Sequence, residues 1–286
     1  MKLQFLRRRG LGKGSTEGMV EFLRKWGVDA SVVRNDLAKT DAPVIVRWGC
    51  TGYTGGAKII INESEAIHTV NSKATFREKL QNSGVSVPKS FFSKESAATA
   101  IARGLRLIGR KSRHAQGKGA EVIATMVELK MSQSDYWSVI IPKTQEFRVY
   151  PFFGRVIQVA EKVMPEDRKH MLLWNKAQGN SAFYNVRWDK WNLDVVLEAL
   201  KVHAISGCDF EGVDVMLHEG VPYILESNSA PSMTTEYRKQ SFAKGFKWMM
   251  DEIERTGEKP QHLELSEHGR GYKDYIHPAV RNGYEK

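Results

Sequence analysis

The chain has 286 residues, of which 41% are hydrophobic and 27% charged, so its composition excludes a disordered polymer and fits one large domain or two to three lobes. Two cysteines are too few for a disulfide scaffold and favour a reducing compartment, the cytoplasm. No apolar run is long enough to span a membrane, and no secretory signal opens the chain. The net charge of +10 indicates an anionic partner: a nucleic acid, a nucleotide or an acidic peptide.

The first half of the chain alternates predicted helices with short predicted strands. Apolar residues at helical spacing predict a helix over 16–26 with Ser15 or Thr16 as its N-cap. Capping serines predict two further helices, over 73–82 and 93–103. Short apolar runs predict strands over 44–46, 59–61, 105–109 and 121–126.

The second half of the chain is richer in predicted strands. Three β-rich runs precede residues 164–191, which show no clear period and are interpreted as a long, partly mobile loop. A polar tail begins at residue 255. Strands and helices follow no strict βαβ order, which favours an α+β or mixed α/β fold over a Rossmann sheet. The predicted strands span 136–141, 147–153 and 156–160, a hairpin spans 212–225, and helices span 193–205 and 236–254.

The predicted hairpin carries three oxygen-bearing side chains that can share one face. Residues two apart in a strand project from the same face, so Glu226 and Asn228 belong together. Asp214 joins them if the turn has an odd number of residues centred on Glu219, whereas a two-residue turn at Glu219 and Gly220 places it on the opposite face. Hard oxygen ligands suit Mg²⁺. In the alternative, structural interpretation, Glu226 pairs with an arginine and Asn228 shapes the next turn.

A basic segment over 110–119 contains glycines whose backbone N–H groups could cradle phosphate oxygens, with Arg110 and Lys118 adding charge. It is not a Walker A loop, because no Gly-Lys-Ser or Gly-Lys-Thr follows at the required spacing. Residues 10–15 are excluded as such a loop because both the spacing and a preceding strand are missing from the predicted elements. A solvated turn is the alternative for 110–119.

A third group of charged residues begins at Glu146. Strand alternation places Glu146 and Arg148 on one face, and Lys162 closes the partner run. The alternative to a functional role is a cross-strand ion pair, which contributes about 0–1 kcal/mol when it is exposed.

Taken together and in this order, these residues resemble the ATP-grasp superfamily, above all carboxylate–amine ligases such as the ribosomal-protein glutamate ligases and ligase-like proteins of phages. The resemblance covers roughly residues 45–250. It implies two α+β lobes that clasp ATP, preceded by a small α/β domain. The implied division is an N-terminal domain over 1–70, a small lobe over 71–141, a large lobe with the metal site over 142–255, and a tail over 256–286.

The resemblance also implies roles for individual residues and for two Mg²⁺ ions, with Mn²⁺ as an alternative. One departure from the family pattern is that Arg110 stands where a phosphate-binding lysine is usual. Adenine is expected against the linker near 138–142. The metal ligands implied are Asp214, Glu226 and Asn228, the catalytic residues Arg148, Lys162 and Asn185, and the nucleotide-binding residues Lys73, Arg110, Gly117, Lys118, Gly119, Ile141 and Lys143.

The implied activity is ATP-dependent ligation of a carboxylate to an amine. The γ-phosphate passes to the carboxylate, and the amine attacks the resulting acyl phosphate with release of ADP and phosphate. The expected partners are ATP, a carboxylate substrate and an amine (an amino acid, a peptide or a polyamine) but no membrane, in the host cytoplasm if a phage encodes the chain. Two other interpretations stay open: a basic nucleic-acid-binding protein without ATP chemistry, and an ATP-grasp-like kinase.

Overall fold

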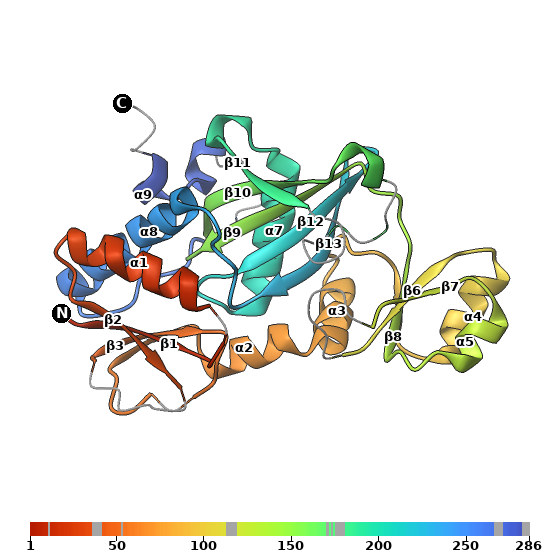
Figure 1. The fold of residues 1–286 in the computed structure, drawn as a ribbon, viewed down its shortest axis with the longest axis horizontal. Coiled ribbons are helices and arrows are strands. Elements are labelled where there is room, and N and C mark those ends of the chain that lie inside the picture. The colour runs from red at the N-terminus through yellow and green to blue at the C-terminus, as the bar shows by residue number, and fades with distance from the viewer. Residues whose placement is uncertain are drawn as a thin grey trace.

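The computed structural model builds the chain around three sheets (Figure 1). It describes residues 1–10, 12–35, 42–52, 54–112, 119–169, 172, 174, 181–265 and 271–281. The mixed α/β architecture agrees with the predicted fold class. None of the helices in this described part combines the length and the apolar composition that crossing a membrane requires.

The N-terminal sheet is parallel and has the strand order β2-β1-β3-β4. Neither of its first two strands was predicted, because each is short and its apolar residues run directly into basic ones. A strand therefore does precede residues 10–15, and this part of the sequence interpretation was wrong. The strands are β1 (Leu3–Arg7), β2 (Ala30–Arg34), β3 (Val44–Trp48) and β4 (Ile59–Ile61), and the helices are α1 (Lys13–Lys25) and α2 (Ser64–Asn71).

Helix α1 begins earlier than the apolar period indicated. Its N-cap is Gly12, which has a left-handed backbone with φ of 67°, and not Ser15 or Thr16. Residues 13–15 lie in the first turn and carry no apolar side chain, so periodicity could not detect them. The helix packs along α8 and over the sheet (Figure 1).

The second sheet is antiparallel, has the order β5-β8-β6-β7, and lies at the far end of the molecule from the N-terminal sheet (Figure 1). It has a small core of its own around Leu107 and Trp137. The strand predicted over 121–126 stops at Ile123, because Thr125 and Glu128 form a capping box that starts a helix. The elements are α3 (Lys73–Asn82), β5 (Ser90–Phe91), α4 (Lys94–Ala102), β6 (Leu107–Arg110), β7 (Glu121–Ile123), α5 (Met126–Met131) and β8 (Tyr136–Val139).

The third sheet is antiparallel with the order β11-β10-β9-β12-β13. Its edge strand β11 lies inside the segment 164–191 that was predicted as loop, so that prediction was wrong for residues 182–186; half-exposed edge strands show little apolar alternation. The strands are β9 (Gln145–Phe152), β10 (Arg155–Val163), β11 (Ala182–Val186), β12 (Gly212–His218) and β13 (Val221–Asn228). Helices are α7 (Leu193–Ser206), α8 (Glu236–Thr256) and α9 (Pro278–Arg281), with short 3₁₀ turns at Glu166–Arg168, Trp188–Lys190 and Tyr272–Tyr275.

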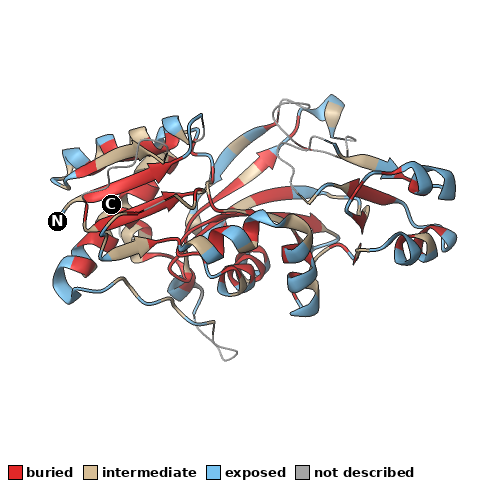
Figure 2. Ribbon diagram, turned by 90° about the horizontal axis from the view of Figure 1, so that it is seen from below, coloured by how far each residue is buried: buried red, intermediate tan, exposed pale blue. Residues whose placement is uncertain are grey.

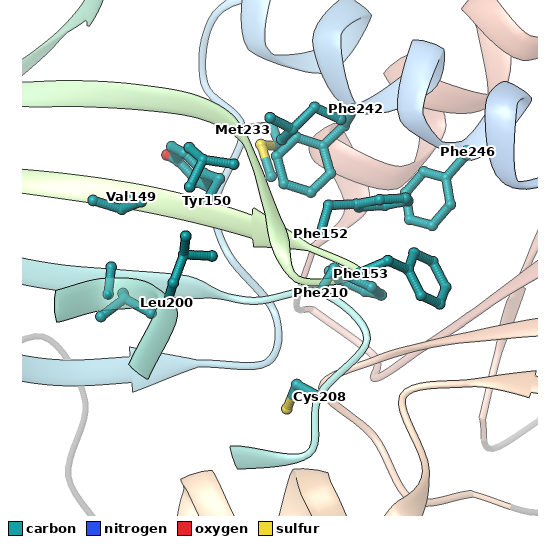
Figure 3. Close-up of a cluster of buried hydrophobic side chains, with 14 of the residues drawn as sticks. Val149, Tyr150, Phe152, Phe153, Leu200, Cys208, Phe210, Met233, Phe242 and Phe246 are labelled. Carbon is teal, nitrogen blue, oxygen red and sulfur yellow. The ribbon is translucent and has the colours of Figure 1, made fainter. Parts of the chain in front are cut away.

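One large hydrophobic core joins the first and third sheets through α8. Buried residues concentrate along strands and on the inner faces of helices, while the outer faces are exposed (Figure 2). Trp48 of β3 stacks on Phe210 at a ring-centroid distance of 5.0 Å. Phe152 of β9 meets Phe246 of α8 edge-on at 5.1 Å (Figure 3). Each such buried aromatic contributes about 1.5–3 kcal/mol, so the first and third sheets are packed as one unit.

Burial of His277 predicts a loss of stability in mild acid. Its imidazole lies edge-on to Phe152 and Trp248, and burial, aided by the charge of Arg155, lowers its pKa from 6.5 to about 3. Between these two pH values the unfolded chain binds a proton that the folded chain does not, so stability present above pH 6.5 is lost as the pH falls.

We therefore expect His277→Asn to lessen the decrease in unfolding free energy between pH 7 and pH 4.5 by about 2–3 kcal/mol, measured by urea titration. His68→Asn, at an exposed position of α2, is the control and should retain the full decrease. Identical decreases in the wild-type and His277→Asn proteins would mean that His277 is not the group that titrates.

Candidate active site

The β12–β13 hairpin turns through two residues, Glu219 and Gly220, which have positive φ angles of 50° and 80°. The odd-numbered turn that would bring Asp214 to the face of Glu226 is therefore absent from this hairpin. Further from the turn, however, the pairing register shifts by one residue: Val215 pairs with Ile224, but Asp214 pairs with Glu226, which leaves Leu225 as an extra residue. This β-bulge reverses the parity of the turn and brings both carboxylates to the same face.

Arg77 of α3 holds the bulge from outside the sheet. Its Nη1 donates to the carbonyl oxygen of Ile224 at 2.6 Å, and its Nη2 donates to that of Leu225, the extra residue. Burial lowers the pKa of Arg77 to about 10, so the guanidinium stays charged at neutral pH. Helix α3 therefore braces the strand that carries Glu226.

A row of paired residues, all polar except Ala160, crosses one face of the third sheet. Strand pairing aligns Asn185, Ala160, Arg148, Asp214 and Glu226 from β11 to β13. Arg148 donates two hydrogen bonds to Asp214, from Nε to Oδ1 at 2.5 Å and from Nη2 to Oδ2 at 2.7 Å. Burial opposes the charged form, but the Asp214 carboxylate outweighs it and raises the pKa of Arg148. The row thus places a permanent cation beside two acidic groups.

Glu226 is ionised in this setting. Burial alone would raise its pKa, but Lys73, a hydrogen bond from Asn228 Nδ2 at 3.1 Å and the charge of Arg148 lower it to about 2. Lys73 is anchored nearby, because its Nζ donates to the carbonyl of Ser227 at 2.5 Å.

The donor set of Asp214, Glu226 and Asn228 fits Mg²⁺, because it offers two carboxylates and an amide oxygen on one face. The described part of the chain contains no cluster of three or more His, Cys, Asp or Glu suited to a metal. The acidic ligands at this site are therefore the two carboxylates of Asp214 and Glu226. Both Asp214 oxygens accept from Arg148, so a metal ion has to compete with the guanidinium for them.

A second row of charged residues lies two residues before Arg148 on β9 and is built around Glu146. This carboxylate is 3% exposed and accepts from Lys143 Nζ at 2.6 Å and from Lys162 Nζ, its cross-strand partner. Burial lowers the pKa of Lys143, whose ammonium also lies 4.7 Å from the centroid of the Trp174 ring. The sequence placed Glu146 with Arg148 on one face and left an exposed cross-strand ion pair as the alternative, whereas the structure buries Glu146 between two predicted site lysines.

Phe183 and Arg238 are further residues of this face that sequence reasoning missed. The ring of Phe183 lies 5.0 Å from Arg148, 5.4 Å from Lys162 and 5.5 Å from Arg238. Arg238 Nε donates to Asn185 Oδ1 at 2.9 Å, which joins α8 to the row. Phe183 was missed because β11 was taken for a loop, and nothing in the local pattern of α8 marks Arg238.

Comparisons with known proteins identify the fold. No protein-family model matches the sequence, and no curated protein is significantly similar to it. Among solved structures, the ATP-grasp ligase PsnB, complexed with a phosphomimetic precursor variant, Mg and ADP, superposes with a TM-score of 0.64 at 12% identity, covering 86% of this chain and 97% of PsnB. The chain has the ATP-grasp fold.

Two other ATP-grasp structures support the same conclusion. D-alanine–D-alanine ligase from Bacillus anthracis, complexed with ATP, superposes with a TM-score of 0.59 at 15% identity, covering 82% of this chain and 87% of the ligase. A RimK domain protein from Sphaerobacter thermophilus gives 0.56 at 13% identity, covering 84% of this chain and 96% of that protein. At these identities the likeness concerns the fold.

Within this ATP-grasp fold, a small cavity lies where α3, β6 and β13 meet. Its polar lining includes Lys73, Arg77, Arg110, Tyr136 and Glu226. Arg110 and Lys73 both act on the charge of Glu226. Three cations beside one carboxylate suit an anion that itself carries a metal ion, and a polyphosphate is such an anion.

Two of the remaining predicted nucleotide-binding residues, Ile141 and Lys143, lie between β8 of the second sheet and β9 of the third. Gly117 and Lys118 lie outside the described residues, and Gly119 precedes β7 with a left-handed φ of 70°. Ile141 is half-buried in this linker between β8 and β9. Lys143 ends the same linker but is turned toward Glu146.

Proposed function

We propose that this chain is an ADP-forming, ATP-dependent carboxylate–amine ligase that works through an acyl phosphate. The observation that supports this most directly is the pairing of Asp214 with Glu226 across the bulged hairpin, with Arg148 alongside and the cationic cavity next to it. Phosphoryl transfer requires charge neutralisation and alignment, and these residues supply both.

In this proposal Asp214, Glu226 and Asn228 hold two Mg²⁺ ions, which neutralise phosphate charge when bound. Lys73 and Arg110 bind phosphate oxygens from the cavity side. The catalytic cations are Arg148 and Lys162, which stabilise negative charge on the acyl phosphate and on the tetrahedral species that follows. Asn185 helps to orient these catalytic cations through its contact with Arg238.

The nucleotide is proposed to lie along the lobe boundary. Ile141 and Lys143 take the adenine and ribose side, and Gly117, Lys118 and Gly119 cover the phosphates. The division at residues 70, 141 and 255 and a cytoplasmic location complete the proposal. One PsnB structure contains a precursor peptide, so a peptide carboxylate is a candidate substrate beside an amino acid.

The decisive experiment is a screen of ADP release with Mg-ATP across amino acids, polyamines and short peptides, with product mass as the readout. A product mass equal to both substrates minus water supports the ligase. A stable phosphate ester identifies a kinase instead. Steeply salt-dependent nucleic-acid binding without ADP release under any pair of substrates overturns the proposal in favour of a nucleic-acid-binding protein.

A further inference from the structure

The connection between β1 and α1 is basic, rich in glycine and placed at the carboxyl edge of a parallel sheet. β1 ends at Arg7, the exposed Arg8 and Arg9 follow, and α1 begins at Lys13. In sheets of this kind, ligands bind where strands end and the next helix begins, because backbone N–H groups and the helix dipole point there.

The N-terminus of α1 offers donors that the described residues do not satisfy. Gly12 provides no side-chain cap, and the first turn contains no acidic residue. Trp48 is 1% exposed, and its indole Nε1 lies 2.8 Å from where a Cβ on Gly12 would stand, with no hydrogen-bond partner in the described chain. Arg7, 7% exposed, lies beside Trp48 in the strand register, and its Nε likewise has no partner among the described residues.

Gly14 is a glycine that the fold itself does not demand. Its φ is not in the left-handed region, and a Cβ built there would have no atom within 4 Å. Glycine in a helix costs stability relative to alanine, and a glycine in this first turn leaves the backbone open to close approach by a ligand. Gly12 differs, because a Cβ there would collide with the Trp48 ring at 2.5 Å.

This helix end is attached to the candidate active site. Ser15 Oγ accepts from the backbone N–H of Met233 at 2.9 Å. A Cβ on Gly49, just after β3, would touch the Ala230 side chain at 2.5 Å. Both partners belong to the segment that leaves β13 directly after Asn228. A group bound at α1 is therefore next to the chain that carries the proposed metal ligands.

We propose that the N-terminus of α1 binds an anionic group, a phosphate or a carboxylate, on one of the substrates. Backbone N–H groups of the first turn, the indole of Trp48, and the charges of Arg7 and Lys13 form the site. The acidic neighbour is Glu17, whose Oε1 lies 3.5 Å from Arg7 Nη2 but is 45% exposed, so it leaves the positive charge largely uncompensated. The assignment to a substrate rests on the proposed function, whereas the anion site does not.

The test is a titration of the full chain, saturated with Mg²⁺ and a non-hydrolysable ATP analogue, with inorganic phosphate or, separately, succinate at constant ionic strength. The readout is the ¹H–¹⁵N signal of the Trp48 indole. A saturable shift with phosphate, or with succinate alone, supports the site and distinguishes the two chemistries. No saturable shift of this signal with either anion overturns it.

Two variants separate binding from folding. Gly14→Ala and Lys13→Gln are expected to raise the dissociation constant at least fivefold without melting below the wild type. Lys25→Gln removes the same charge at the other end of α1 and should change it less than twofold. Unchanged affinity in Gly14→Ala overturns the proposal. Because no turnover is measured, a chain that fails the ligase screen but binds the anion at Trp48 disproves only the proposed function.

Discussion

Glu226→Gln is expected to reduce Mg-ATP-dependent ADP release by about 10³-fold or more, and Asp214→Asn by a similar factor. Both substitutions preserve shape and remove charge. Glu226, with a pKa of about 2, is ionised at every pH at which such an assay is run, so the glutamine variant loses a full negative charge. Without it, Lys73 and Arg148 remain to bind phosphate, but the acidic half of the metal site is gone.

The matched control is Glu219→Gln in the exposed turn of the same hairpin, which should retain wild-type turnover. Each variant is compared by ADP release with the substrates found in the screen and by calorimetric titration with ATP in the presence and absence of Mg²⁺. The Mg²⁺ dependence of ATP affinity should disappear in Glu226→Gln. Full turnover in both carboxylate variants would falsify the metal assignment.

Arg77→Met is expected to lower the free energy of unfolding by about 2–4 kcal/mol and ADP release by about 10-fold or more. Two carbonyl oxygens, of Ile224 and Leu225, lose a charged donor at a site where Arg77 is 8% exposed. The bulge at Leu225 is then held only by strand pairing, so the opposition of Asp214 and Glu226 is weakened.

Urea unfolding and ADP release measure the two effects, and Arg103→Met at the exposed C-cap of α4 is the control. Arg77→Lys separates charge from geometry, because a lysine can reach only one of the two carbonyls well and should restore stability more than activity. If Arg77→Met keeps both wild-type stability and wild-type turnover, the bulge does not depend on α3.

Elements with a strong local pattern were predictable from the sequence. The helix over 73–82 and the strand over 59–61 have the predicted bounds, because a serine and a glycine flank the helix and three successive isoleucines form the strand. The residues of β1, β11 and α5 were missed. β1 is short and its apolar residues run directly into basic ones, β11 is a half-exposed edge, and α5 is too short to show a period.

Part of the candidate site was likewise predictable from local pattern, and part was not. Residue type and strand alternation are enough to put Glu226 with Asn228, and Glu146 with Arg148. Nothing local linked Phe183 or Arg238 to these residues, because their contacts cross from β11 and α8 to β9. The Trp48 indole and Gly12 likewise come together only when β3 and α1 pack.

The sequence by itself determined which side chains are available to this protein: carboxylate and amide oxygens of the kind that suits a hard cation, basic residues of the kind that suits phosphate, and glycines that leave the backbone open to close approach. The tertiary structure decided whether that chemistry converges. A two-residue turn alone would place Asp214 away from Glu226, and one extra residue in β13, braced by Arg77 from another element, reverses the outcome. Side-chain parity accumulates along a hairpin, so a single bulge decides it, and the contacts that stabilise the bulge lie about 150 residues away in the chain.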